Sequence, residues 1–246
     1  MRKPQKHAMN ALISNKQKFT FVFLFVLVID IFVKLYCPIF PFRYISKAPV
    51  ILLLIVFYLT HQEEDNKRNF WWMFLGLSVF FLGDMLIISH ENVVCLGLSL
   101  LLFTLGKLFF SFRFSNKNDF RVSRLIPFSI VIFLYTLAIV SYVYDYLNAF
   151  FLPVIISYFI SLLMFQLTYL RKGSVNDASY KFVFYGVICF FISEGVMVIK
   201  TFRGDVPFQD TIIMFFYGLA MLLIVKGVIL EKKQKYPSVH VLNLKD

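Results

Sequence analysis

Long apolar segments alternate with short polar ones along the chain, and this alternation predicts its architecture. A membrane-spanning helix needs about 20 predominantly apolar residues, because each residue adds ~1.5 Å of rise across a hydrocarbon core ~30 Å thick. Eight segments come close to this length, at about 19–37, 48–60, 70–89, 93–112, 125–144, 149–170, 180–199 and 211–230. The second is short, and it can begin earlier, near Tyr44. We therefore expect an all-α fold, a polytopic integral membrane protein built as a bundle of eight transmembrane helices.

The composition supports the same class. Hydrophobic residues make up 59% of the chain and charged residues 16%, against about 45–50% and 25% in soluble domains. The apolar run 51–57 does not alternate with polar residues, which argues against a transmembrane β-barrel. We expect a basic leader over residues 1–18, the transmembrane domain over 19–230 and a polar tail over 231–246.

The basic residues lie mostly between the apolar segments. With the N-terminus inside, the inner polar segments hold 18 of the 25 lysines and arginines and the outer loops hold 4. Because cytoplasmic loops carry the excess of Lys and Arg, we expect both termini to be cytoplasmic, in a bacterial inner (cytoplasmic) membrane. Topology also accounts for the net charge of +11, so no nucleic-acid partner is expected. Cys37, Cys95 and Cys189 lack the spacing of metal ligands, and no metal site is expected.

Several charged residues fall inside the apolar segments, where ionisable groups are costly and usually mark a functional site. Asp84 and Glu194 lie equally far along two segments that run outward, so both carboxyl groups are expected at one level in the outer half. Tyr217 should reach a comparable depth, whereas Lys107 should lie nearer the cytoplasmic side. The competing interpretation is structural, with each carboxyl group tied to a lysine or tyrosine so that it only holds helices together.

Asp30 and Lys34 form a second charged pair within the first segment. Their spacing of i, i+4 places them on one helix face, which predicts a self-neutralising pair with Lys34 reaching outward. Asp30 should lie near the middle of the membrane, which makes it a third carboxyl group inside the membrane beside Asp84 and Glu194.

The order of short polar motifs resembles the YhhN-like lysoplasmalogenase family over roughly residues 30–230. The motifs are Lys47-Ala48-Pro49, Gly83-Asp84, Gly106-Lys107, Ser193-Glu194 and Tyr217. The resemblance implies eight helices and a hydrolase that cleaves the vinyl ether bond of lysoplasmalogens, giving a fatty aldehyde and a glycerophospho-head group. It implies a lipid or lysophospholipid as the partner, and the reaction needs no metal or cofactor.

Such a reaction predicts roles for the polar residues. A vinyl ether hydrolyses when an acid protonates its carbon and water attacks the resulting oxocarbenium ion, and a second, ionised carboxylate can stabilise that cation, as paired carboxylates do in glycosidases. We expect Glu194 to be the acid and Asp84 the ionised partner. Tyr217, Lys107, Lys47 and Asp30 are candidates for binding or orienting the substrate and the attacking water.

The chain departs from the family pattern at three places. The family usually has His where this chain has Lys107, Asp where it has Glu194, and Gln where it has Met221. Two other functions therefore stay open: a relative that binds or moves an amphiphile without cleaving it, and an ion- or proton-coupled transporter that uses Asp30, Asp84 and Glu194 as a relay. The sequence gives no indication of the oligomeric state.

Overall fold

The structure, a computed structural model, describes residues 16–37, 39–64, 66–115 and 122–232. Its α-helices are α2 (Lys16–Tyr36), α3 (Phe42–His61), α4 (Lys67–Leu86), α5 (Val93–Phe114), α6 (Val122–Val143), α7 (Phe151–Leu170), α8 (Asp177–Phe202) and α9 (Gln209–Ile229). Three short 3₁₀ helices, η1 (Ile87–Ser89), η2 (Tyr144–Tyr146) and η3 (Asn148–Phe150), extend or join them. Within the described residues, eight helices are long and apolar enough to cross a membrane, which confirms the predicted eight-helix membrane fold.

Local sequence explains several helix boundaries. Asn66 starts α4 by accepting a hydrogen bond from the Arg68 N–H, and Asn92 starts α5 by accepting from Val94 and Cys95. A side-chain oxygen at this position satisfies backbone donors that have no partner within the helix. The tight connections thus turn the chain back at once, so that α4 and α5 pack as an antiparallel pair.

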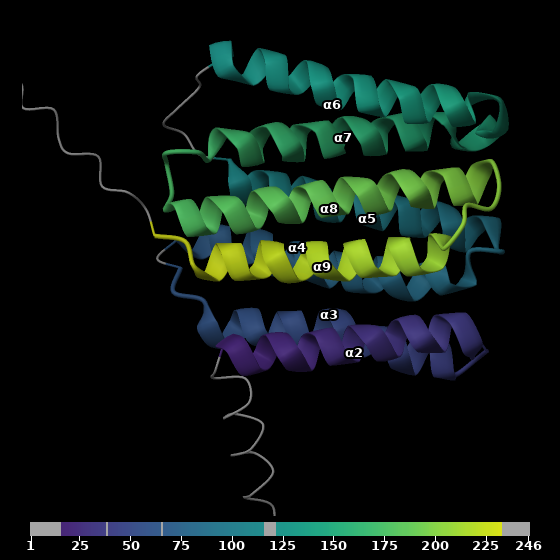
Figure 1. The fold of residues 1–246 in the computed structure, drawn as a ribbon, viewed down its shortest axis with the longest axis horizontal. Helices are drawn as coiled ribbons and strands as arrows, with labels where there is room; N and C mark the ends of the chain where they lie inside the picture. Colours follow the sequence, from purple (N-terminus) through teal and green to yellow (C-terminus); the bar gives the residue numbers. More distant parts are fainter. Residues whose placement is uncertain (1–15, 38, 65, 116–121, 233–246) are drawn as a thin grey trace, which may run out of the picture.

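Six helices form a ring, and two lie outside it. The helices α4 and α5 pack together, as do α8 and α9, while α3 joins α4 to α9 and α7 joins α5 to α8. Helix α2 covers α3 and α9 along one edge of the molecule, and α6 covers α7 and α8 along the opposite edge (Figure 1). The ring therefore has an interior that all six helices can line.

The two halves of the chain follow the same order. In the first half α2 lies at the edge, α3 comes next, and α4 and α5 reach the centre; in the second half α6, α7, α8 and α9 take the corresponding places (Figure 1). The contact between α3 and α9 corresponds to the contact between α7 and α5. The correspondence holds within the ring but not for the outer helices, because α2 packs on α9 of the other half whereas α6 packs on α8 of its own half. Membrane proteins with repeated halves commonly place their sites where the halves meet.

Aromatic side chains fill much of the ring on one side of its interior. The Phe80 ring lies 5.1 Å from that of Phe110 and 5.6 Å from that of Phe190, measured between centroids. Gly106 allows this packing, because a Cβ there would lie 2.8 Å from the Phe80 ring. In contrast, α6 exposes many large apolar side chains along its length, as a helix facing lipid does.

Candidate active site

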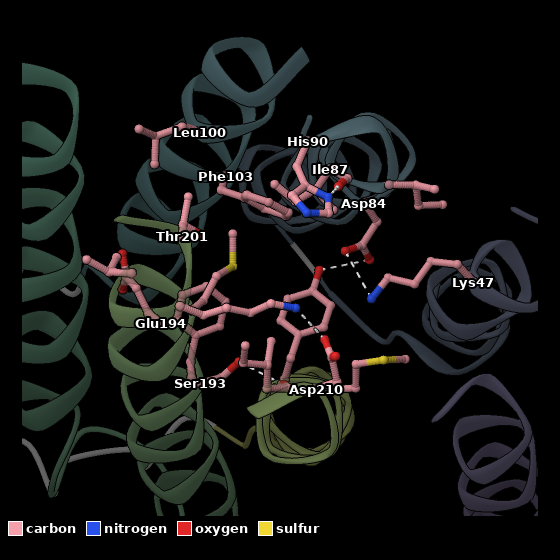
Figure 2. A pocket seen from close by; sticks show the side chains of 18 of the residues that line it. Lys47, Asp84, Ile87, His90, Leu100, Phe103, Ser193, Glu194, Thr201 and Asp210 are labelled. Carbon is pink, nitrogen blue, oxygen red and sulfur yellow. Dashed lines mark hydrogen bonds and ion pairs between the residues drawn. The ribbon is translucent and has the colours of Figure 1, made fainter. Parts of the chain in front are cut away.

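One cavity opens inside the ring and contains most of the predicted polar residues. Its volume is about 180 Å³. Asp84, Glu194, Tyr217, Lys107 and Lys47 all line it, together with apolar side chains that include Leu100, Phe103 and Phe190. Figure 2 shows Asp84 and Lys47 on one side of the cavity and Glu194 on the other. The space between them is therefore bounded by two carboxyl groups and by apolar walls.

Asp84 is held by one residue of its own half and one of the other half. Its side chain is buried on α4, and its Oδ2 accepts a hydrogen bond of 3.0 Å from the Tyr217 hydroxyl on α9. The Lys47 ammonium on α3 lies 3.5 Å from Oδ1 and 5.0 Å from the centroid of the Tyr217 ring. Because 3.5 Å exceeds the usual N–H···O range of ~2.7–3.2 Å, Oδ1 is the less tightly bonded oxygen.

Glu194 on α8 sits in a denser set of donors. Lys107 on α5 places its Nζ 2.6 Å from Oε1, and the Ser161 hydroxyl on α7 donates to Oε2 at 2.7 Å. The Ser157 hydroxyl lies 3.3 Å from Oε1. Lys107 also bonds to both serine hydroxyls, at 2.6 and 2.7 Å, so the ammonium group is fully surrounded by oxygen. Such a charge-assisted network fixes both side chains in place.

The two carboxyl groups have corresponding surroundings in the two halves. Asp84 on α4 is bonded by Tyr217 from α9 and faces Lys47 from α3. Glu194, on the corresponding helix α8, is bonded by Lys107 from α5 and by the serines of α7. Each half thus supplies one carboxyl group and a hydrogen-bonding partner for the carboxyl group of the other half.

The predicted pairing of Asp30 with Lys34 is wrong. Asp30 is fully buried, and it accepts hydrogen bonds from Arg43 and, at 2.8 Å, from the Ser46 hydroxyl. Lys34 instead lies 3.8 Å from Asp210 at the start of α9. Helix spacing permits the i, i+4 pair, but the guanidinium group of α3 offers Asp30 a partner inside the bundle. Asp30 therefore lies behind Arg43, which lines the cavity, and is not itself a lining residue.

Several residues of the site were not anticipated from the sequence. Ser157 and Ser161 are spaced i, i+4 on one face of an apolar helix, and this spacing was the signal that could have pointed to them. Arg43 precedes the expected start of the second span, so the apolar pattern did not mark it as a residue of the site. Ser193, by contrast, donates a 2.8 Å bond to the Ile213 carbonyl and so joins α8 to α9.

No group of three or more His, Cys, Asp or Glu side chains that could hold a metal ion occurs among the described residues. The side chains that line the cavity offer acids, bases and hydrogen-bond donors instead. The Lys107 ammonium bonds to Glu194, so it reaches the level of that carboxyl group and does not lie at the different depth expected from the sequence.

The fold and the cavity together define a multi-pass helical membrane protein with an internal site of carboxyl and ammonium groups. The sequence model of the YhhN family matches residues 42–228, so the chain belongs to the YhhN family. The match covers seven of the eight spanning helices, from α3 to α9, and contains both carboxyl groups. Searches of the curated proteins and of the solved structures found no match.

Proposed function

We propose that this protein is a membrane-embedded hydrolase that cleaves the vinyl ether bond of a one-chain ether lipid such as a lysoplasmalogen. The observation that carries the proposal is the pair of carboxyl groups, Asp84 and Glu194, lining one cavity with apolar walls. Membership of the YhhN family, which is a lysoplasmalogenase-like family, supports the same class of reaction. The products would be a fatty aldehyde and a glycerophospho-head group.

The reaction needs one proton donor, one water and one stabiliser of positive charge. Protonation of the outer vinyl carbon breaks the π bond and leaves an oxocarbenium ion on the carbon attached to oxygen. Water then bonds to that carbon and gives up a proton to a carboxylate, forming a hemiacetal. The hemiacetal collapses as its hydroxyl gives up a proton, its bond to the glycerol oxygen breaks and that oxygen takes a proton, so that one water is consumed overall.

The hydrogen bonds favour Asp84 as the acid and Glu194 as the ionised partner, the reverse of the sequence-based assignment. Both oxygens of Glu194 accept short bonds, one of them from an ammonium group at 2.6 Å. A proton on either oxygen would displace one of these donors. Oδ1 of Asp84 faces the Lys47 ammonium only at 3.5 Å, so a proton on this oxygen would displace no short hydrogen bond. Tyr217 then orients the acid through Oδ2.

Aldehyde release from lysoplasmalogen by the purified protein tests this function. Asp84→Asn and Glu194→Gln should each lower kcat/KM by at least ~100-fold, the usual contribution of a positioned acid or base. Asp145→Asn, an exposed carboxyl group outside the cavity, is the matched control and should retain full activity. Full activity in both cavity variants would exclude the mechanism.

A lipid-binding relative without catalysis is the second candidate. The observation in its favour is that Lys107 and Lys47 each lie close to one of the two carboxyl groups, as in structural ion pairs. A lipid that copurifies with the protein but yields no aldehyde would support this alternative. Under this alternative, Asp84→Asn and Glu194→Gln should copurify with as much lipid as the unchanged protein.

A further inference from the structure

The mouth of the cavity carries one more positive than negative side chain. Lys34 ends α2, Arg43 begins α3 and Lys200 lies near the end of α8, so these three cations share one end of the bundle with the start of α9. The set of cations is Lys34, Arg43 and Lys200, and the acidic groups bonded to them are Asp30 and Asp210. Three cations thus face two carboxyl groups, and one positive charge is left without a carboxylate.

Arg43 offers a buried donor at this place. The residue is 6% exposed and lines the cavity. Its Nη1 donates to Asp30 and, at 3.3 Å, to the Ser46 hydroxyl, while its Nη2 lies 3.6 Å from the sulfur of Met214. A thioether is a weak acceptor. The guanidinium group therefore keeps a strong donor that an oxyanion in the cavity could bind.

Lys34 and Lys200 share a single carboxylate. The Lys200 Nζ lies 2.6 Å from Asp210 Oδ1, and the Lys34 Nζ lies 3.8 Å from the same oxygen. The side chains of Lys200 and Lys34 are 23% and 24% exposed and both line the cavity, so they lie at its rim. Lys34 in particular has only a distant anion, and it can turn toward a second one.

We propose that Arg43, Lys34 and Lys200 form a binding site for the phosphodiester of a one-chain lipid at the mouth of the cavity. A phosphodiester carries a single negative charge, which matches the single uncompensated positive charge. The residues lie at helix ends, the level at which a headgroup sits in a membrane. The apolar walls below, including Phe103 and Phe190, then receive the chain. The lipid part of this proposal rests on the proposed function; the anion site does not.

Binding to the full-length protein in neutral detergent tests the site without any turnover. The probes are a saturated alkyl lysophosphocholine, the matching alkylglycerol without phosphate, glycerophosphocholine without a chain, and inorganic phosphate. We expect the alkyl lysophosphocholine to bind ~10-fold more tightly than the alkylglycerol, in keeping with a hydrogen bond to a charged group. Measurable competition by inorganic phosphate alone would identify a general anion site; competition by glycerophosphocholine but not phosphate would identify a headgroup site.

Variants distinguish binding at this site from a general attraction of anionic lipid to a basic protein. Lys200→Gln should reduce the ~10-fold preference to about twofold or less, whereas Arg203→Gln should leave it unchanged. Arg203 lies at the same end of the bundle but packs over Tyr142, with 3.5 Å from its guanidinium carbon to the ring centroid. Arg43→Gln would strand the Asp30 carboxylate, so it is paired with Asp30→Asn, and this double variant should also lose the preference.

Asp210→Asn should change the affinity for the phosphodiester in the opposite direction. It releases two ammonium groups, and we expect the phosphodiester to bind about threefold or more tightly, which loss of structure could not produce. Equal binding of the lipid with and without phosphate, or equal loss in Lys200→Gln and Arg203→Gln, would overturn the site. If the preference holds while no lipid is cleaved, the anion site stands and the hydrolase does not. If cleavage occurs without any such preference, the hydrolase stands and the anion site does not.

Discussion

The contact between Lys107 and Glu194 joins the two motif positions at which polar residues differ from the family pattern. A His and an Asp are usual at these positions, and here a Lys and a Glu occupy them, with 2.6 Å between the ammonium nitrogen and Oε1. Both replacements keep a base opposite a carboxyl group. The third departure, Met221, is fully buried among apolar side chains and does not line the cavity. The cavity therefore keeps its acid and base types despite the changes.

This pairing makes a prediction about stability. Lys107→Met should destabilise the protein by about 3–5 kcal/mol, because it leaves a buried carboxylate without its cation. Glu194→Gln combined with Lys107→Met should recover part of this loss, since both charges are then removed. Thermal unfolding in detergent measures the three variants as a double-mutant cycle. Additive losses in the double variant would show that the two side chains do not depend on each other.

Individual residues were predictable where burial alone is costly. Asp84 and Glu194 stand out because a carboxyl group inside an apolar segment must have a function or a partner. Their partners were not predictable, since a pairing such as Asp30 with Arg43 depends on how α2 and α3 pack, which no spacing within one helix encodes. Ser157 and Ser161 are small and only weakly polar, and they gain their role from the lysine that reaches them.

At the scale of helices, the position of α3 shows what hydropathy misses. The apolar pattern placed its start near residue 48, or earlier near Tyr44, whereas the helix begins at Phe42 and contains Pro49. The extra turns carry Arg43 and Lys47, whose charges lower the mean hydropathy although both side chains are buried against carboxyl groups. Boundaries were least predictable where helix ends contribute to the site.

Helices α8 and α9 approach closely at a glycine, and this contact sets the position of Glu194 relative to Tyr217. A Cβ on Gly186 would lie 3.0 Å from the Ala220 carbonyl oxygen and 3.1 Å from the Ile224 nitrogen. Both atoms belong to the backbone and cannot turn aside, and close helix packing in membranes depends on such small residues.

Gly186→Leu should therefore destabilise the protein by about 3 kcal/mol and lower activity through the displaced α8. Gly97→Ala is the control, because its Cβ would meet only Phe150, at 3.8 Å, and stability should change by less than ~0.5 kcal/mol. Thermal unfolding and aldehyde release measure both variants. Equal stability of the two would show that α8 and α9 can separate without cost.

At the scale of the whole molecule, a buried ionic network closes the end of the bundle opposite the cavity mouth. Arg113 at the end of α5 bonds to Glu64 before α4 and to Glu231 after α9, at 2.8 and 2.9 Å. Arg171 after α7 reaches the same oxygen of Glu231 at 2.7 Å. Burial lowers the pKa of Arg171 to about 10 although Glu231 opposes the shift. The network therefore joins four chain segments at this end of the bundle.

Glu231 should make the stability of this end depend on pH. Burial alone would raise the pKa of its carboxyl group, but Arg113 and Arg171 outweigh burial and lower the pKa below its ordinary value of 4.5. The carboxylate therefore stabilises the fold above pH 4.5, and this contribution is lost as the pH falls through the lower folded-state pKa. Glu231→Gln should lower the free energy of unfolding by about 3 kcal/mol at pH 7. In thermal unfolding, the stability of this variant should also decline less steeply below pH 4.5 than that of the unchanged protein. A wild-type decline of the same steepness as the variant's would contradict this role.

The orientation of the bundle in the membrane follows from the charge of its loops and stays a prediction. The cavity mouth lies at the end where α2 and α8 finish, and the ionic network lies at the end where α5 and α7 finish. The excess of Lys and Arg places the network end in the cytoplasm and the mouth outside. Substrate and product headgroups would then exchange on the outer face, while the closed end separates the cavity from the cytoplasm.

Cysteine labelling in intact cells tests this orientation. Cys37 is exposed just after α2, at the end of the bundle that carries the mouth, and with Cys95→Ser and Cys189→Ser it becomes the sole thiol. A membrane-impermeant maleimide should label it without permeabilisation, because a thiol beyond the outer helix end faces external water. A matched variant without native cysteines that carries Lys172→Cys, at an exposed position of the opposite end, should be labelled only after permeabilisation. The reverse pattern would place the cavity mouth in the cytoplasm and would move headgroup exchange to the inner leaflet.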